Sequence, residues 1–131
     1  MALLSPVAID GVFVFCSFEN AAFGEHSNLQ PMAAIVESEG LTLVIPKSKA
    51  DAHGLHYETV FKAITLGVHS SLDAVGLTAA VSTKLAAHGI SANVIAGYFH
   101  DHVLVPLVEF EEAFALLTAL QEQVNQEITR H

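Results

Sequence analysis

The strongest constraint on the fold is a hydrophobic period that changes three times in the second half of the chain. Residues 61–68 alternate around Ile64 and Leu66, which predicts a strand. Leu77, Val81 and Leu85 then recur at every fourth residue, which predicts a helix that ends at Gly89.

The pattern then returns to strands and finally to a second helix. Residues 90–99 and 102–107 predict two antiparallel strands with a turn at His100-Asp101. A second helical stripe follows, made of Phe110, Ala113, Phe114, Leu117, Leu120 and Val124. The order strand, helix, strand, strand, helix predicts an α+β fold of the ferredoxin-like class, with helices on one face of an antiparallel sheet.

The first half of the chain predicts mostly strands. Residues 12–18 form one apolar run, and residues 32–37 and 41–45 flank Glu39-Gly40 as a hairpin. The spacing from Ser48 to Asp51 predicts the start of a short helix. We therefore expect an incomplete half over residues 1–59 and a βαββα half over residues 60–131, whose strands complete one another in one compact unit.

Composition and charge restrict the possible partners. The 131 residues are 52% hydrophobic and 15% charged, which predicts a folded globular chain. Its apolar runs are shorter than the roughly 20 residues of a membrane span. A net charge of -9 without a basic cluster argues against nucleic acid and anionic membranes as partners. The N-terminal residues lack a signal-peptide pattern, so we expect a cytoplasmic location.

Residues 73–95 resemble the ACT-domain pattern, in which a strand is followed by an Asp-x-x-Gly turn, an apolar helix and a Gly-Ile step into the next strand. Asp73 and Gly76 match the turn, and Gly89-Ile90 match the helix exit. The longer runs 65–80 and 93–102 resemble a small bacterial family of stand-alone ACT-like proteins, related to the regulatory ACT domains of aspartate kinases. The resemblance implies a regulatory module that binds an amino acid, often across a dimer interface.

The segment between the predicted strand and helix has a chemistry that suits an amino acid. Backbone N–H groups at a helix start favour a carboxylate, and an acidic side chain can hold an ammonium group. The predicted ligand-binding residues are His69, Ser70, Ser71, Asp73, Val75, Gly76, Leu77, Ser91 and Asn93. The alternative interpretation is that Ser70, Ser71 or Asp73 only caps the helix.

The histidines of the chain suggest a second hypothesis, a metal-binding site. The chain has 8 His, and His100, Asp101 and His102 form the densest group of possible metal ligands. A hydrogen-bonded or solvated turn is the simpler interpretation of this group. Three other histidines, His53, His56 and His88, lie near predicted helix ends, where an imidazole binds the last carbonyls.

No sequence motif of a hydrolase, phosphate-binding loop or zinc protease is present, and Cys16, the only cysteine, lies in an apolar run that predicts burial. We therefore predict a non-catalytic amino-acid-binding module without a cofactor. Its ligand would lie at residues 69–77, at an interface between subunits or halves, in a homodimer or higher homo-oligomer. The alternatives are a metal-binding protein that uses His100, Asp101 and His102, and a purely structural oligomerisation module.

Overall fold

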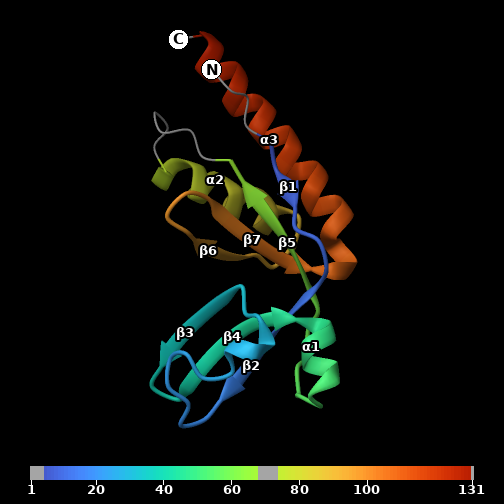
Figure 1. Cartoon of the computed structure of the whole chain (residues 1–131). Coiled ribbons are helices and arrows are strands. Elements are labelled where there is room, and N and C mark those ends of the chain that lie inside the picture. The colour runs from blue at the N-terminus through green and yellow to red at the C-terminus, as the bar shows by residue number, and fades with distance from the viewer. Residues whose placement is uncertain (1–4, 68–73, 131) are drawn as a thin grey trace. The chain divides into compact units, whose positions relative to one another are not determined.

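The computed structural model describes residues 5–67 and 74–130, with only the backbone described for residues 74–77, 124–125 and 127–130 (Figure 1). The chain divides into two units. Unit 1 comprises residues 1–10 and 62–131, and unit 2 comprises residues 11–61. Each unit is described separately.

Unit 1 follows the predicted order of strand, helix, two strands and helix. Its elements are β1 (Val7–Ala8), β5 (Phe61–Leu66), α2 (Ala74–Ala87), β6 (Asn93–Ala96), β7 (Asp101–Pro106), the 3-10 helix η2 (Leu107–Glu109) and α3 (Phe110–Arg130). Its sheet has the order β1-β5-β7-β6, and the two-residue β1 pairs antiparallel with the end of β5. A strand from the start of the chain therefore joins the βαββα pattern, and the predicted α+β ferredoxin-like class is confirmed.

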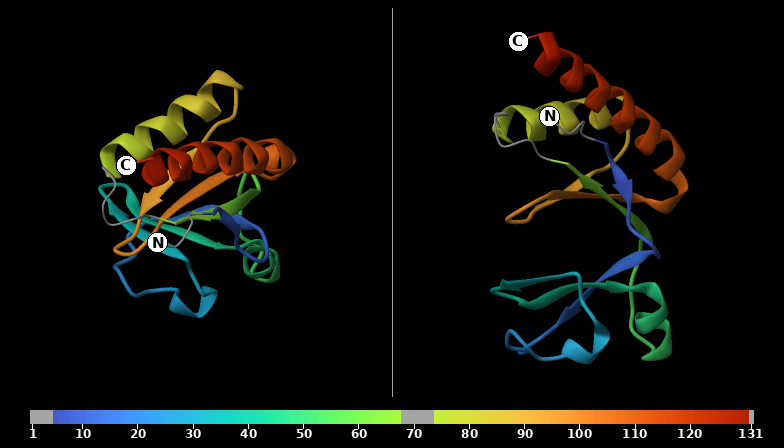
Figure 2. Two further views of the ribbon diagram at one scale, coloured as in Figure 1. Left: turned by 90° about the horizontal axis from the view of Figure 1, so that it is seen from above. Right: turned by 45° about the horizontal axis from the view of Figure 1, so that its top comes forward.

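The two long helices of unit 1 lie on the same face of its strands, as Figure 2 shows. The core between helices and sheet consists of Ile64, Leu66, Val81, Leu85, Ile90, Val103, Val105, Ala113 and Leu117, all at most 4% exposed. Because Val81, Leu85, Ala113 and Leu117 recur at spacings of four, each helix contributes one apolar stripe to this core.

The hairpin of unit 1 differs from the prediction. Strand β6 ends at Ala96, where residues 90–99 were expected to form one strand, and β7 already begins at Asp101. The chain reverses over Gly97–His100, and the Gly97 N–H donates to the His100 carbonyl at 2.9 Å. A Cβ on Gly97 would lie 2.8 Å from that carbonyl oxygen, so the close approach requires glycine and places the turn earlier than His100-Asp101.

Unit 2 is a three-stranded antiparallel sheet in the order β3-β4-β2. Its elements are β2 (Phe13–Phe18), the 3-10 helix η1 (Ser27–Leu29), β3 (Ala33–Glu37), β4 (Gly40–Pro46) and α1 (Lys47–Ala52). The β3–β4 hairpin confirms the prediction, with Gly40 at φ +146°. Helix α1 begins at Lys47 with Pro46 as its N-cap, so Ser48 lies inside the helix and is not its cap as expected.

The core of unit 2 lies on one face of this sheet. Its buried members are Val14, Cys16, Leu29, Leu41, Leu43, Ile45 and Ala50. Cys16 is 4% exposed, and desolvation by burial raises the pKa of its thiol. The predicted burial of this cysteine is confirmed.

Candidate functional site

The turn between β5 and α2 is where the sequence predicts a ligand. Strand β5 ends at Leu66 and α2 begins at Ala74, so residues 67–73 connect a strand end to a helix start. Of the predicted ligand-binding residues, His69, Ser70, Ser71 and Asp73 lie outside the described residues.

The first turn of α2 contains the next three predicted residues, Val75, Gly76 and Leu77. The first four backbone N–H groups of an α-helix have no partner inside the helix, and the helix dipole adds partial positive charge there. The backbone at this end of the 14-residue α2 is therefore a suitable place for a carboxylate.

The side chain of Gln121 reaches the beginning of this turn from α3. Its Nε2 donates a hydrogen bond of 3.2 Å to the carbonyl oxygen of Gly67, the first residue after β5. Gln121 is only 1% exposed, and its Oε1 atom is buried without a hydrogen-bond partner among the described residues. Because the amide nitrogen must face the Gly67 carbonyl, the oxygen must face elsewhere.

The sequence interpretation missed Gln121. It occupies the apolar stripe of α3, four residues after the fully buried Leu117. A polar residue at a core position of a helical stripe is the signal that could have identified it, since buried polar groups need partners.

Ser91 and Asn93, the last two predicted residues, lie at the start of β6. Both are exposed, and Asn93 is paired with Leu104 of β7. Near the end of β5, the Thr65 side chain contacts His102 of β7, and His102 is paired with Ile95 of β6. Asn93 lies two residues before Ile95 along β6, so it is not at the level of the sheet where β5 ends.

The histidines have mainly structural partners. His102 Nδ1 lies 3.0 Å from Thr65 Oγ1, while Asp101 pairs with Ala96 in the hairpin. Within residues 5–67 and 74–130, no group of three or more His, Cys, Asp and Glu is arranged to hold a metal ion. The described residues thus give no support to the metal hypothesis.

Of the three histidines expected at helix ends, two bind carbonyls as predicted, whereas His56 Nε2 lies 3.9 Å from Glu58 Oε1. His53 Nδ1 lies 2.9 Å from the Lys49 carbonyl at the end of α1, and His88 Nδ1 lies 3.1 Å from the Lys84 carbonyl at the end of α2. Both imidazoles occupy the helix C-termini, where the last carbonyls lack partners inside the helix.

Two charged groups on the surface of unit 2, Lys47 and Asp51, have shifted pKa values, and the hydrogen bond to Asp51 raises that of Lys47. Asp51 accepts hydrogen bonds of 2.8 Å from Lys47 Nζ and from the Tyr57 hydroxyl. The Lys47 bond, followed by the Tyr57 bond, lowers the pKa of Asp51 below its ordinary value. These residues stabilise the carboxylate and hold α1 to the segment that follows it.

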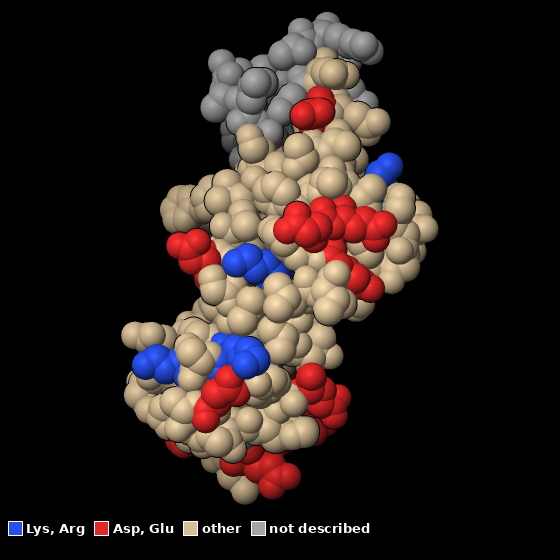
Figure 3. Space-filling model, turned by 90° about the vertical axis from the view of Figure 1, so that its right-hand side faces the viewer, with Lys and Arg blue, Asp and Glu red and all other residues tan. Residues whose placement is uncertain are grey.

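On the face shown in Figure 3, the described lysines lie in small separate groups near acidic side chains and form no continuous basic region. The full chain has 5 Lys and Arg against 14 Asp and Glu. None of the helices formed by the described residues combines the length and the apolar character needed to cross a membrane.

The fold and the order of its elements define the class of protein, an ACT-like module. Two ACT-domain family models match the chain, one over residues 1–62 and the other over residues 58–119. A Vibrio cholerae protein of unknown function, described as a possible transport protein, is 49% identical, with 88% of each chain covered and a TM-score of 0.80. The chain belongs to the ACT-domain family.

More distant structures share the fold. The α and β subunits of an aspartokinase match with a TM-score of 0.66 and 12% identity, with 90% of this chain and 93% of that chain covered. A putative C-terminal regulatory domain of aspartate kinase from Porphyromonas gingivalis matches with a TM-score of 0.58 and 15% identity, with 88% and 95% covered. A search of curated protein sequences found no match. Membership of the ACT-domain family makes the chain a regulatory, ligand-binding type of module.

Proposed function

We propose that this protein is a non-catalytic regulatory module that binds a free amino acid at the turn between β5 and α2. The observation that carries the proposal is the buried amide of Gln121, whose Oε1 has no partner among the described residues while its Nε2 binds the first carbonyl after β5. A buried acceptor left without a hydrogen bond costs about 1–3 kcal/mol, and a ligand N–H group would recover that cost.

The proposed binding mode assigns each end of the amino acid to a different set of groups. The backbone N–H groups of Val75, Gly76 and Leu77 would hold the carboxylate at the start of α2. Asp73 or Ser71, together with the Oε1 atom of Gln121, would accept hydrogen bonds from the ammonium group. His69, Ser70, Ser91 and Asn93 complete the set of residues that the sequence predicts around the ligand.

Regulation would follow from a difference in ligand affinity between two states of the protein. A ligand shifts an equilibrium only as far as its affinity for the two states differs. We propose that the two states differ in association, either as a homodimer or higher homo-oligomer with the ligand near a subunit interface, or with a regulated partner protein.

The experiment is a thermal-shift screen of the full chain, treated with a chelator and dialysed, against each of the twenty amino acids at millimolar concentration. An amino acid at about 100 times its Kd adds about 2.7 kcal/mol, which raises the Tm of a chain of this size by several degrees. The absence of a shift with all twenty would contradict the proposal.

One variant with a matched control tests the site itself. Gln121→Met removes the buried acceptor and retains the length of the side chain, whereas Gln123→Met makes the same change at an exposed position of α3. A hydrogen bond to a charged group contributes about 1.5–3 kcal/mol, so Gln121→Met should weaken binding at least tenfold and Gln123→Met should not. Equal affinities of the two variants would place the ligand elsewhere.

A further inference from the structure

A second candidate site lies in unit 2, where an open cavity of about 300 Å³ is formed between the β3 edge of the sheet and the segment that connects β2 to β3. Ala34 and Leu43 face each other across β3 and β4 and lie on the core side of the sheet. Phe23, Ser27, Pro31 and Met32 supply walls from the connecting segment. The volume is at the lower end of the range of small-molecule sites.

The cavity exists because no α-helix covers this part of the sheet. Between β2 and β3 the only helical element is η1, with three residues, and Leu29 is its buried side chain. Leu29 packs into the core, but Phe23 remains 75% exposed beside the cavity. The connecting segment therefore leaves apolar surface at the β3 edge open to a ligand.

The connecting segment has an unusual backbone. Among the described residues, the non-glycine residues with positive φ are Asn20, His26 and Gln30, and all three lie in this segment. Side chains other than glycine rarely adopt this conformation, and such strain is concentrated at functional sites. The strained positions flank the residues that line the cavity.

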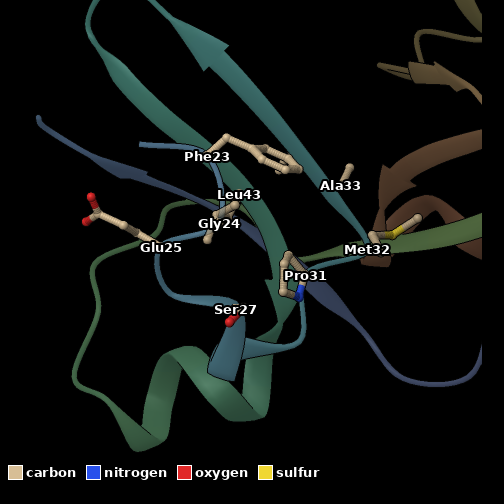
Figure 4. A pocket seen from close by; sticks show the side chains of 9 residues that line it. Phe23, Gly24, Glu25, Ser27, Pro31, Met32, Ala33 and Leu43 are labelled. Atoms are coloured by element: carbon tan, nitrogen blue, oxygen red, sulfur yellow. The ribbon is translucent and has the colours of Figure 1, made fainter. Parts of the chain in front are cut away.

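The one charged residue that lines the cavity, Glu25, is acidic. Figure 4 shows the Phe23 ring extending toward Ala33, while the Glu25 carboxylate is turned to the side opposite Pro31, Met32 and Ala33. Glu25 Oε1 accepts a hydrogen bond of 3.1 Å from the Ala22 N–H. Residues 19–46 contain no Lys or Arg and have four acidic residues, Glu19, Glu25, Glu37 and Glu39. The other lining residues are apolar, apart from Ser27 with its hydroxyl group.

We propose that this cavity binds an uncharged organic molecule with an apolar part the size of a phenyl ring and one hydroxyl-like group. The apolar part would lie on Ala34 and Leu43 beneath Phe23, and the polar group would lie toward Ser27 and solvent. This site is separate from the amino-acid site proposed above, because its lining residues include the acidic Glu25 and no Lys or Arg that could bind a free carboxylate.

The test is titration of the ¹⁵N-labelled full chain with two probes that share a phenyl group, namely 2-phenylethanol and phenylacetate. We expect 2-phenylethanol to shift the amide signals of residues 23–34 and 43, with a Kd on the order of 1 mM. Phenylacetate should bind at least tenfold more weakly. Absence of shifts with 2-phenylethanol, or equal affinity for phenylacetate, would overturn the proposal.

Three variants locate the site. Ala34→Phe fills the cavity from the core side of β3 and should weaken 2-phenylethanol binding at least tenfold. Ile35→Phe adds a ring to the next residue, whose side chain points to the other face of the strand, and should leave the affinity unchanged. Phe23→Ala removes the exposed wall and should weaken binding several-fold in a folded protein. Wild-type affinity in both Phe23→Ala and Ala34→Phe would overturn the proposal.

Discussion

The two units contain helices and strands in the same order, but the segments that cover their cores differ in length. In unit 1 the connection between the first two strands of the βαββα pattern is α2, with 14 residues, and the last element is α3, with 21 residues. In unit 2 the same positions are occupied by η1, with three residues, and α1, with six. Apart from β1, the strands have the same order, β5-β7-β6 in unit 1 and β2-β4-β3 in unit 2, so the main difference lies in what covers them.

Local sequence explains this difference. The α2 segment has apolar residues at Val81 and Leu85, with two alanines before Val81 and two after Leu85, which favours a helix packed on a sheet. The segment between β2 and β3 contains Gly24 and Pro31 and lacks such a stripe. Consequently, a ligand can meet a helix N-terminus in unit 1 but an open apolar sheet face in unit 2.

The largest expected effect comes from truncating a buried side chain in the segment that covers each sheet, which is α2 in unit 1 and η1 in unit 2. Leu85→Ala in α2 should lower the free energy of unfolding by about 3 kcal/mol. The Leu85 side chain is fully buried, and the long helix cannot move into the cavity that its removal leaves. Leu29→Ala in η1 should cost less, about 2 kcal/mol, because its short connecting segment can move into the space. Urea denaturation of both variants measures the difference.

Thr83→Ala, an exposed change on α2, is the control and should change stability by less than about 0.5 kcal/mol. A larger loss for Leu29→Ala than for Leu85→Ala would show that the unit 2 cover is the more rigid of the two.

A second test enlarges a small side chain in each unit. Ala113→Leu in the unit 1 core should cost about 1–3 kcal/mol, because Ala113 is fully buried between α3 and its neighbours. Ala34→Leu in unit 2 should instead raise stability by about 0.5–1 kcal/mol, because the new side chain enters the cavity beside Leu43. Thermal and urea unfolding measure both changes.

Ala119→Leu, at an exposed position of α3, controls for helix propensity and should be close to neutral. A destabilised Ala34→Leu would mean that the cavity closes in solution.

The periodic parts of unit 1 could be predicted from the sequence because each helix has one clear apolar stripe. The stripes of Val81 and Leu85 and of Ala113 and Leu117 place α2 and α3 correctly. The turn of the β6–β7 hairpin was displaced because Gly97 and His100 make a close backbone contact that side-chain alternation does not encode. The pairing of β1 with β5 depends on residues far apart in the chain, which local patterns do not reveal.

The candidate site could be predicted only in part. The strand-to-helix turn follows from local pattern, and α2 begins one residue after Asp73. Gln121 was missed because its role depends on a contact with Gly67, 54 residues earlier in the chain. The unit 2 cavity was missed for another reason, since it arises from the absence of a helical cover and has no motif of its own.

A third test compares how often each core opens. Cys16, the only cysteine, lies in the unit 2 core, where its raised thiol pKa keeps it protonated and unreactive. A second probe, Ala113→Cys in a Cys16→Ala background, reports on the unit 1 core. We expect Cys16 to react with a disulfide reagent at pH 8 about tenfold faster than the cysteine introduced at position 113. The reason is that a region covered by few residues opens at a lower free energy.

Native-state labelling rates, normalised to the rates in urea, give this comparison. Equal normalised rates would mean that the two cores open in one cooperative step, and that the difference in cover has no effect on local stability.

The smallest expected effect concerns how α1 is held in unit 2. Asp51 accepts bonds from Lys47 and Tyr57, which lower its pKa, so the folded state favours the ionised carboxylate more than the unfolded chain does. The stability from this contact is present above the ordinary pKa of 3.8 and is lost as the pH falls through the lowered value of the folded state.

Asp51→Asn should therefore be less stable than the wild type at neutral pH and equally stable in strong acid, as measured by urea denaturation across the pH range. Because the group is exposed, the difference should be smaller than those of the core variants and should shrink in high salt. Tyr57→Phe removes one of the two bonds and should give a part of the same pH-dependent loss. A difference that persists unchanged into strong acid would mean that α1 is held by packing of the Asp51 side chain and not by its charge.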